Sequence, residues 1–99
     1  MNFDQRVHKI LLKIPKGKVT TYKEIAEALG TKAYRAVGSA LNRNKHPEMY
    51  PCYKVVNSDG RVGGFALGTN DKIRRLQKDG IEVVSGKIKD FNKKIYRLS

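Results

Sequence analysis

Hydrophobic residues recur at helical spacing along the first 14 residues of the chain. The residues that share this apolar stripe are Phe3, Val7, Ile10, Leu11 and Ile14. A stripe of this period predicts an amphipathic helix over residues 3 to 13. Pro15 and Gly17 come directly afterwards, and both residue types end helices.

The next part of the chain predicts two shorter helices. Thr21 and Glu24 have the spacing of a capping box, in which the threonine hydroxyl accepts the amide of Glu24 and the glutamate carboxylate reaches back. This start predicts a helix over residues 22 to 29 that ends at Gly30. A second periodic segment covers residues 33 to 42. Two short helices joined through a glycine predict a helix-turn-helix.

Extended and turn patterns come next. Residues 53 to 56 predict a short strand, residues 57 to 60 a turn, and residues 61 and 62 the returning strand of a hairpin. A last clear helix, capped by Thr69 or Asn70, is expected to reach Asp79. The tail, residues 81 to 99, is basic and weakly periodic. We expect one domain over residues 1–99, mainly α with a small β-hairpin and similar to a winged helix-turn-helix.

The net charge of the chain narrows the classes of partner that it could bind. The chain has 21 Lys and Arg against 9 Asp and Glu, a formal net charge of +12, and a pI near 10.0. A field of this size attracts polyanions and favours nucleic-acid binding over a merely solvated basic surface. The sequence has no apolar run that could span a membrane and no signal peptide. We therefore expect no membrane partner and a location in the cytoplasm, with the nucleoid, or in the nucleus.

The predicted helix over residues 33 to 42 carries many small residues. Gly38 costs about 1 kcal/mol relative to Ala in a helix interior, so its presence needs a reason. One reason is close approach of a DNA groove, with Arg35 reaching into or across the duplex. The other is packing of Gly38 against the first helix, and the residues alone leave both reasons open.

Cys52 is the only cysteine in the chain. An intramolecular disulfide is therefore excluded. The two histidines and the carboxylates match no familiar zinc spacing, so no metal site is predicted. A buried small residue and a nucleophile both remain as interpretations of this thiol.

Five runs of residues favour the nucleophile. They are, in chain order, IPKGKVTTY (14–22), RAVG (35–38), PCYKVV (51–56), SDG (58–60) and GGF (63–65). Together they resemble the C-terminal domain of the O6-alkylguanine-DNA alkyltransferases over residues 3 to 80. The related alkyltransferase-like proteins bind alkylated DNA but carry Trp or Ala at the position of the acceptor cysteine, which this chain retains as Cys52.

The resemblance implies direct repair of DNA. An O6-alkylguanine flips out of the duplex into a pocket, and the cysteine thiolate takes its alkyl group as a thioether, which consumes the protein. The resemblance implies no cofactor and no metal, and we expect a monomer that acts on double-stranded DNA. The catalytic residues implied at matching positions are Cys52 as acceptor, Tyr53, Asp79 and Asn44.

Two binding surfaces are implied as well. Tyr22 would press on the phosphate of the flipped nucleotide, Arg35 would fill the gap in the base stack, and the helix over residues 33 to 42 would lie in the minor groove. The implied DNA-binding residues are Thr21, Tyr22, Arg35, Ala36, Gly38 and Ser39. The residues implied to line the base pocket are Pro47, Val55, Gly63, Gly64 and Phe65.

Two positions depart from the family pattern. Tyr53 stands where the family has a histidine that removes the thiol proton through a water, and Asp79 stands for the glutamate that orients this histidine. A neutral phenol, with a pKa of about 10, is a poor acceptor for the proton of a thiol with a pKa of about 8.5. A reactive Cys52 would then need its thiolate favoured by Lys54, by the basic surroundings or by a helix N-terminus.

Three functional interpretations remain. The first is an alkyltransferase that repairs O6-alkylguanine through Cys52. The second is a non-catalytic sensor that flips alkylated bases and recruits other repair proteins. The third is a helix-turn-helix regulator or DNA-packaging protein, and a regulator would prefer a DNA sequence rather than a lesion.

Overall fold

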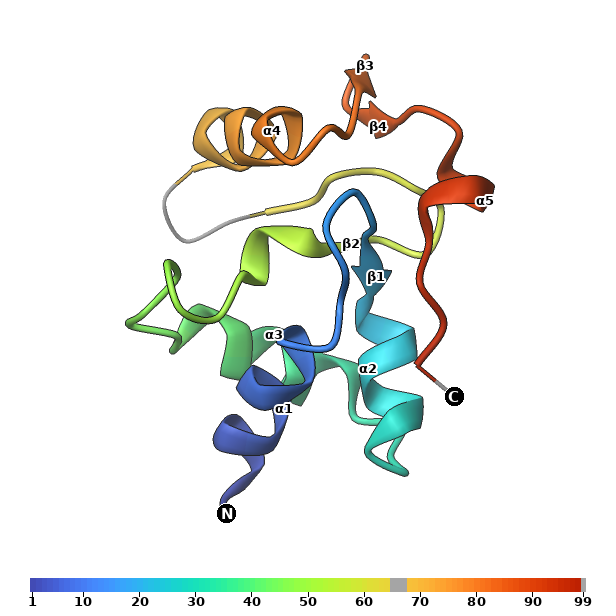
Figure 1. Ribbon diagram of the computed structural model, residues 1–99. Helices are drawn as coiled ribbons and strands as arrows, with labels where there is room; N and C mark the ends of the chain where they lie inside the picture. Colours follow the sequence, from blue (N-terminus) through green and yellow to red (C-terminus); the bar gives the residue numbers. More distant parts are fainter. Residues whose placement is uncertain (65–67, 99) are drawn as a thin grey trace.

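The computed structural model describes residues 1–64 and 68–98, which form short helices and two-residue strands. The elements are α1 (Phe3–Leu11), β1 (Thr20–Thr21), α2 (Tyr22–Ala28), α3 (Tyr34–Asn42), the 3-10 turn η1 (Cys52–Lys54), β2 (Val55–Val56), α4 (Thr69–Lys78), β3 (Val83–Val84), β4 (Lys87–Ile88) and α5 (Phe91–Lys94). Figure 1 shows α1, α2 and α3 grouped on one side of β1 and β2, and α4 with β3 and β4 on the other. The predicted fold class, mainly helical with a small β-hairpin, is confirmed.

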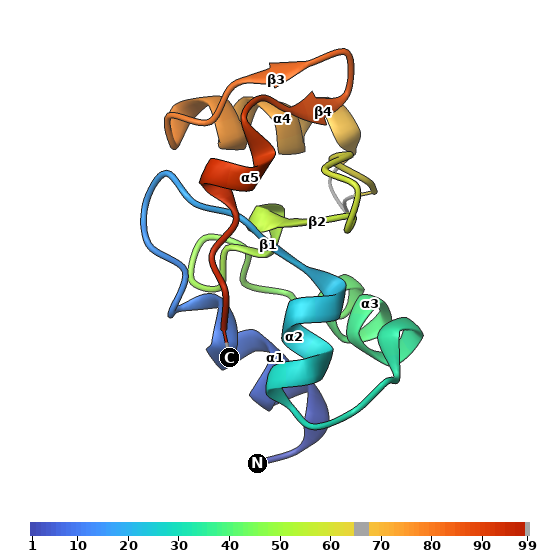
Figure 2. The ribbon, with the colours of Figure 1, turned by 90° about the vertical axis from the view of Figure 1, so that its right-hand side faces the viewer.

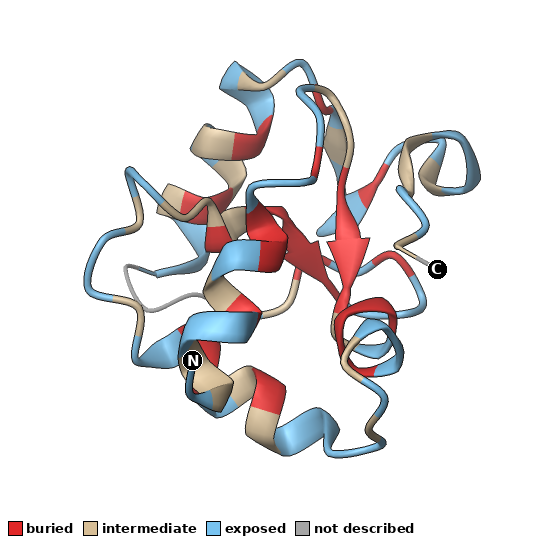
Figure 3. Cartoon of the chain, turned by 60° about the horizontal axis from the view of Figure 1, so that its bottom comes forward, coloured by how far each residue is buried: buried red, intermediate tan, exposed pale blue. Residues whose placement is uncertain are grey.

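β1 and β2 separate two hydrophobic cores. The strands run parallel, with Thr20 opposite Val55. Because successive side chains of a strand point to opposite faces, Val55 packs in the core built by α1, α2 and α3, whereas Val56 packs with Leu76 of α4. Both valines are fully buried, and Figure 3 shows the two strands in the buried interior. Cys52 joins the first core directly before β2.

α1 ends two residues before the predicted boundary. Its apolar stripe is buried as expected, with Ile10 and Leu11 in the first core. Beyond the helix the amides bond to carbonyls three residues back, Lys13 N to Ile10 O at 2.9 Å and Ile14 N to Leu11 O at 3.3 Å. Because Pro15 disfavours the α conformation in the residue before it, the helix tightens here into a turn.

α2 and α3 form the predicted helix-turn-helix. The connection passes through Gly30, which has a φ of +72° that suits glycine. α2 is one residue shorter at its end than predicted, and α3 begins one residue later. The Thr21 hydroxyl caps α2 by accepting the amide of Glu24 at 3.1 Å.

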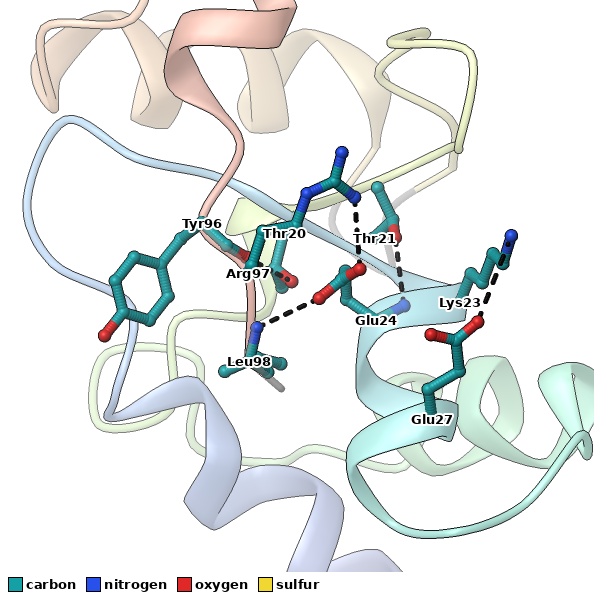
Figure 4. Close-up of polar contacts among 8 residues, drawn as sticks. All are labelled: Thr20, Thr21, Lys23, Glu24, Glu27, Tyr96, Arg97 and Leu98. Carbon is teal, nitrogen blue, oxygen red and sulfur yellow. Dashed lines mark hydrogen bonds and ion pairs between the residues drawn. The ribbon is translucent and has the colours of Figure 1, made fainter.

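The Glu24 carboxylate does not complete the predicted capping box. It accepts instead the amide of Leu98 at 2.9 Å and the guanidinium of Arg97 at 3.1 Å, as Figure 4 shows. The C-terminal segment reaches Glu24 because it runs beside the start of β1, where Tyr96 donates its amide to Val19 O at 2.7 Å. In Figure 2 this segment and α3 lie on opposite sides of β1 and β2. The tail therefore holds the start of α2 from the side away from α3.

The predicted hairpin over residues 53 to 62 is wrong in its pairing. Cys52–Lys54 forms a 3-10 turn, so only β2 remains as a strand, and it pairs with β1. A turn does come next, closed by Asn57 N donating to Arg61 O at 2.9 Å, but Arg61 then forms a bridge with Lys87 of β4. The hairpin of this fold consists of β3 and β4, in the tail that the sequence left without a clear element.

α4 has a different start from the one predicted. Neither Thr69 nor Asn70 caps it, because Gly68 occupies the N-cap position with a φ of +97° and supplies no side chain. The helix ends at Lys78, and Asp79 is its C-cap residue. None of the described helices has the length and apolar character needed to cross a membrane.

Candidate functional site

A pocket of about 580 Å³ opens between α2, α3 and the Cys52 turn. Its lining residues are Tyr22, Tyr34, Arg35, Gly38, Leu41, Asn42, Cys52, Asn57 and Gly64. The wall thus combines a thiol, two phenols and a guanidinium. Five residues that the sequence places at a site meet here: Tyr22, Arg35, Gly38, Cys52 and Gly64.

Cys52 begins the η1 turn and is only 8% exposed. Its amide donates to Tyr50 O at 2.7 Å, and the Asn44 side chain donates to the same carbonyl at 2.8 Å, which braces the loop that leads to the cysteine. Burial raises the pKa of the Cys52 thiol. A hydrogen bond with Asn44 and the positive charges of Lys72 and Arg75 oppose this rise in pKa.

The α3 side of the pocket is open. A methyl group at Gly38 would meet no described atom within 4 Å outside its own helix, so packing against another helix does not explain the glycine. Arg35 is exposed and Tyr22 is half-buried in the same wall. Burial raises the pKa of Tyr22, and the charge of Cys52 adds to the rise. The Tyr22 phenol is therefore neutral at physiological pH and can donate a hydrogen bond.

Tyr53 and Asp79 share no hydrogen bond in the described part of the chain. Asp79 Oδ2 lies 3.2 Å from Lys54 Nζ in an ion pair and accepts a hydrogen bond from Gly17 N at 3.0 Å. Lys54 is buried and also donates to two backbone carbonyls in the loop before β1, so its charge is compensated locally rather than directed at the thiol. Asp79 also acts on Tyr53: burial raises the pKa of the Tyr53 phenol, and the negative charge of Asp79 raises it further.

A second groove, of about 750 Å³, lies between the end of α1, the loop before Cys52 and α4. Pro47 and Tyr53 belong to its lining, together with charged residues of α4. The structure therefore places two residues expected at the reaction centre on a wall other than that of the Cys52 pocket. The ring of Tyr53 also packs against the second core, whereas Cys52 belongs to the first.

Lys72 is a buried cation that the sequence analysis does not single out. It lies on α4, is 1% exposed, and donates to Val55 O at 2.7 Å and to Gly64 O at 3.1 Å. Burial lowers the pKa of Lys72 to about 8, and the charge of Cys52 partly offsets this decrease. The helical period could have predicted that Lys72 is buried, because Lys72 precedes the buried Leu76 by one turn and lies on the same face of the helix.

The remaining residues expected to bind DNA lie near the pocket in different settings. Thr21 is 3% exposed, and its hydroxyl is used as the cap of α2. Ala36 is half-buried and Ser39 is exposed on α3. Both side chains are small, like that of Gly38 between them.

The remaining residues expected in the base pocket lie close to Cys52 in the chain or in the glycine-rich segment. Val55 is fully buried in the same core as Cys52, and Gly63 precedes the pocket residue Gly64. Phe65 lies outside the described residues. Within residues 1–64 and 68–98, no three His, Cys, Asp or Glu side chains gather in a group that could hold a metal ion.

The amino-acid sequence was compared with models of known protein families. Residues 2–81 match the model of the 6-O-methylguanine DNA methyltransferase, DNA binding domain. The chain belongs to this family.

Three proteins similar to this chain match different shares of its length. A bifunctional methyltransferase/endonuclease of Picrophilus torridus is 53% identical over 83 residues, which are 83% of this chain and 28% of that protein. A methylated-DNA–protein-cysteine methyltransferase of Methanosarcina barkeri is 47% identical over 72 residues, or 72% of this chain and 46% of the relative. The chain thus spans less than half the length of either methyltransferase.

The third similar protein is S. pombe Atl1, in a crystal structure with damaged DNA that contains O6-carboxymethylguanine. It superposes on this chain with a TM-score of 0.83 at 28% sequence identity. The match covers 98% of this chain and 99% of Atl1. This family member therefore resembles the methyltransferases in sequence over part of their length, and Atl1 in structure over nearly all of it.

Proposed function

We propose that this chain repairs O6-alkylguanine in double-stranded DNA by taking the alkyl group onto Cys52. One observation carries the proposal: the single thiol lies in the wall of a cavity that also presents Arg35 and the open backbone at Gly38. The name of the Methanosarcina relative, a methylated-DNA–protein-cysteine methyltransferase, supports a cysteine acceptor. The chain would act wherever genomic DNA lies, in the cytoplasm or the nucleus.

α3 is the surface proposed to contact the minor groove. Gly38 and the small residues beside it let the helix backbone approach the duplex, and the formal net charge of +12 attracts the phosphates. Arg35 would fill the gap that the flipped base leaves in the stack. Tyr22, a neutral donor in the same wall, would press on the phosphate of the flipped nucleotide.

The flipped base would enter the cavity beside Cys52, with Val55 and Gly64 around it. The thiol first loses its proton to solvent. Its sulfur then attacks the alkyl carbon, so that an S–C bond forms while the C–O6 bond breaks and its electron pair passes to the guanine. The guanine takes up a proton from water. Restored guanine and a thioether remain, and each protein molecule reacts once.

A second candidate is a lesion sensor that binds without transfer. Burial raises the pKa of the Cys52 thiol, and a protonated thiol is a weak nucleophile. The chain also matches Atl1, from a complex with damaged DNA, over nearly its whole length. A sensor would flip the base and recruit other repair proteins. Membership of the family favours both candidates over a sequence-specific regulator.

Restoration of guanine separates the two candidates. A duplex with one O6-methylguanine inside a restriction site is incubated with excess protein and then digested, because cleavage needs the unmethylated base. We expect cleavage after wild-type treatment and none after Cys52→Ala, while both proteins bind the lesion duplex more tightly than the unmodified duplex. Lesion-selective binding without cleavage would refute the alkyltransferase and support the lesion sensor. Equal binding to both duplexes without cleavage would refute both candidates.

A further inference from the structure

We propose that the Lys72 ammonium is the cation that stabilises the Cys52 thiolate, in a chain that has Tyr53 and not histidine after the cysteine. The inference rests on the proposed function, because it assigns a residue to that same transfer. It concerns a side chain on α4, 20 residues after the cysteine in the sequence.

Two hydrogen bonds hold the ammonium beside the reacting turn. Lys72 Nζ donates to Val55 O at 2.7 Å, at the strand that directly follows η1, and to Gly64 O at 3.1 Å, in the pocket wall. An ammonium has three N–H donors, so these two contacts account for two of them. Val55 and Cys52 belong to the same core, and the charges of Lys72 and Cys52 act on each other.

Two other cations near the Cys52 turn, Arg75 and Lys54, have carboxylate partners. Arg75 also acts on the thiol, but its Nε lies 2.7 Å from Asp71 Oδ2 and its side chain is 33% exposed. Lys54 is paired with Asp79. Lys72 takes part in none of the ion pairs of the described residues, so no carboxylate offsets its charge.

The titratable groups on α2, α3 and η1 do not supply this charge. Arg35 lines the same pocket from α3 but is exposed, and water screens its charge. Tyr22 and Tyr53 are neutral at physiological pH and carry a negative charge when they ionise. A buried charge acts more strongly than an exposed one because the surrounding dielectric is lower.

Burial of Lys72 has a cost that the proposed role explains. A lysine that is 1% exposed and lacks a carboxylate partner is rare, since desolvation opposes the charged form. In the proposed role the thiol releases its proton to water and not to the lysine. The thiolate fraction that forms near neutrality then lies beside an ammonium, because Lys72, with a pKa of about 8, is still protonated there. After transfer the sulfur is a neutral thioether and the lysine is unchanged.

The test measures Cys52 reactivity with iodoacetamide in the absence of DNA, from about pH 6 to about pH 10. Lys72→Gln removes the charge while its amide can still donate to a carbonyl, Lys72→Arg keeps the charge, and Lys78→Gln is an exposed control on the same helix. We expect Lys72→Gln to move the midpoint of the profile to higher pH and to slow the reaction about tenfold near neutrality for each pKa unit. Lys72→Arg and Lys78→Gln should keep the wild-type midpoint.

A purely structural role gives a different result. If Lys72 only positions the two carbonyls, Lys72→Gln would change the rate equally at every pH and leave the midpoint in place, which would overturn the proposal. A second measurement leaves Lys72 intact: the pKa of its amine is followed by NMR in the wild type and in Cys52→Ala. Because the coupling between two titrating groups is mutual, the lysine pKa should be higher in the wild type, and equal values would also overturn the proposal.

Neither measurement needs a lesion or a transfer. A wild type that repairs nothing but shows the midpoint shift with Lys72→Gln would refute the proposed repair activity and leave the thiolate assignment standing. A wild type that repairs O6-methylguanine but shows no shift would refute the assignment alone.

Discussion

Lys54 Nζ and Asp79 Oδ2 lie 3.2 Å apart in a buried ion pair that joins the Cys52 turn to the end of α4. The two side chains are 7% and 10% exposed. Gly17 N donates to the same carboxylate oxygen at 3.0 Å, so the loop before β1 is held at this point as well. The Cys52 turn, the end of α4 and the loop before β1 therefore all depend on one carboxylate.

Asp79→Ala is expected to destabilise the protein strongly. Removing one partner of a buried pair leaves the other charge unpaired, which costs about 3–5 kcal/mol of unfolding free energy. Urea denaturation measures the loss. Glu82→Ala is the control, because Glu82 pairs with Lys89 at the surface and is 71% exposed. A loss for Asp79→Ala no larger than for Glu82→Ala would contradict a structural role for the buried pair.

Gly38→Ala is expected to separate stability from DNA binding. Alanine is favoured over glycine by about 1 kcal/mol in a helix interior, and the added methyl meets no described atom, so the melting temperature should rise. The same methyl lies on the face proposed to meet the minor groove, so the affinity for a lesion duplex should fall. A thermal melt and a binding titration test the two effects, and unchanged affinity would remove the reason given for this glycine.

Arg35→Ala is expected to weaken binding to a paired duplex more than binding to a duplex whose target base is already unpaired. The side chain would compensate for the gap in the base stack, and the cost of flipping falls when the base is unpaired. We expect a loss of order tenfold, about 1.4 kcal/mol, on the paired duplex. Arg74→Ala, an exposed arginine of α4, is the control. Equal losses on the two duplexes would argue against a role in flipping.

Alkyl transfer is expected to accelerate with pH. Burial raises the pKa of the Cys52 thiol, so the thiolate fraction still increases at pH values where an ordinary thiol is already ionised. Single-turnover rates measured against pH on one lesion duplex should therefore level off above the ordinary thiol pKa. A rate that is independent of pH through the neutral range would mean that loss of the thiol proton does not limit the reaction.

The sequence predicts the elements whose signals are local. The stripe of α1, the Thr21 cap and the glycine between α2 and α3 depend on residues within a turn or two of each other. Each predicted helix, α1 to α4, appears within two residues of its expected bounds, whereas α5 in the tail is not predicted. Pairing between segments that are distant in the chain is harder to predict from the sequence. β2 pairs with β1, more than 30 residues earlier in the chain, and Glu24 binds Arg97 and Leu98.

The same limit applies to the site. Cys52, Tyr22 and Arg35 stand in recognisable runs, and the structure brings them to one pocket. The environment of the thiol depends on α4 and on which lysine is neutralised. Lys54, next to the cysteine turn in sequence, is paired with Asp79, whereas Lys72 reaches the turn only through tertiary packing.

The central claim is that Cys52 receives an alkyl group from DNA. The direct measurement is intact-protein mass spectrometry after incubation with a duplex that carries one O6-methylguanine, with peptide mapping of Cys52. The account predicts a gain of one methyl group per protein molecule, located on Cys52 and absent from Cys52→Ala. An unchanged mass at saturating lesion duplex, with lesion-selective binding retained, would contradict it and identify the protein as a sensor.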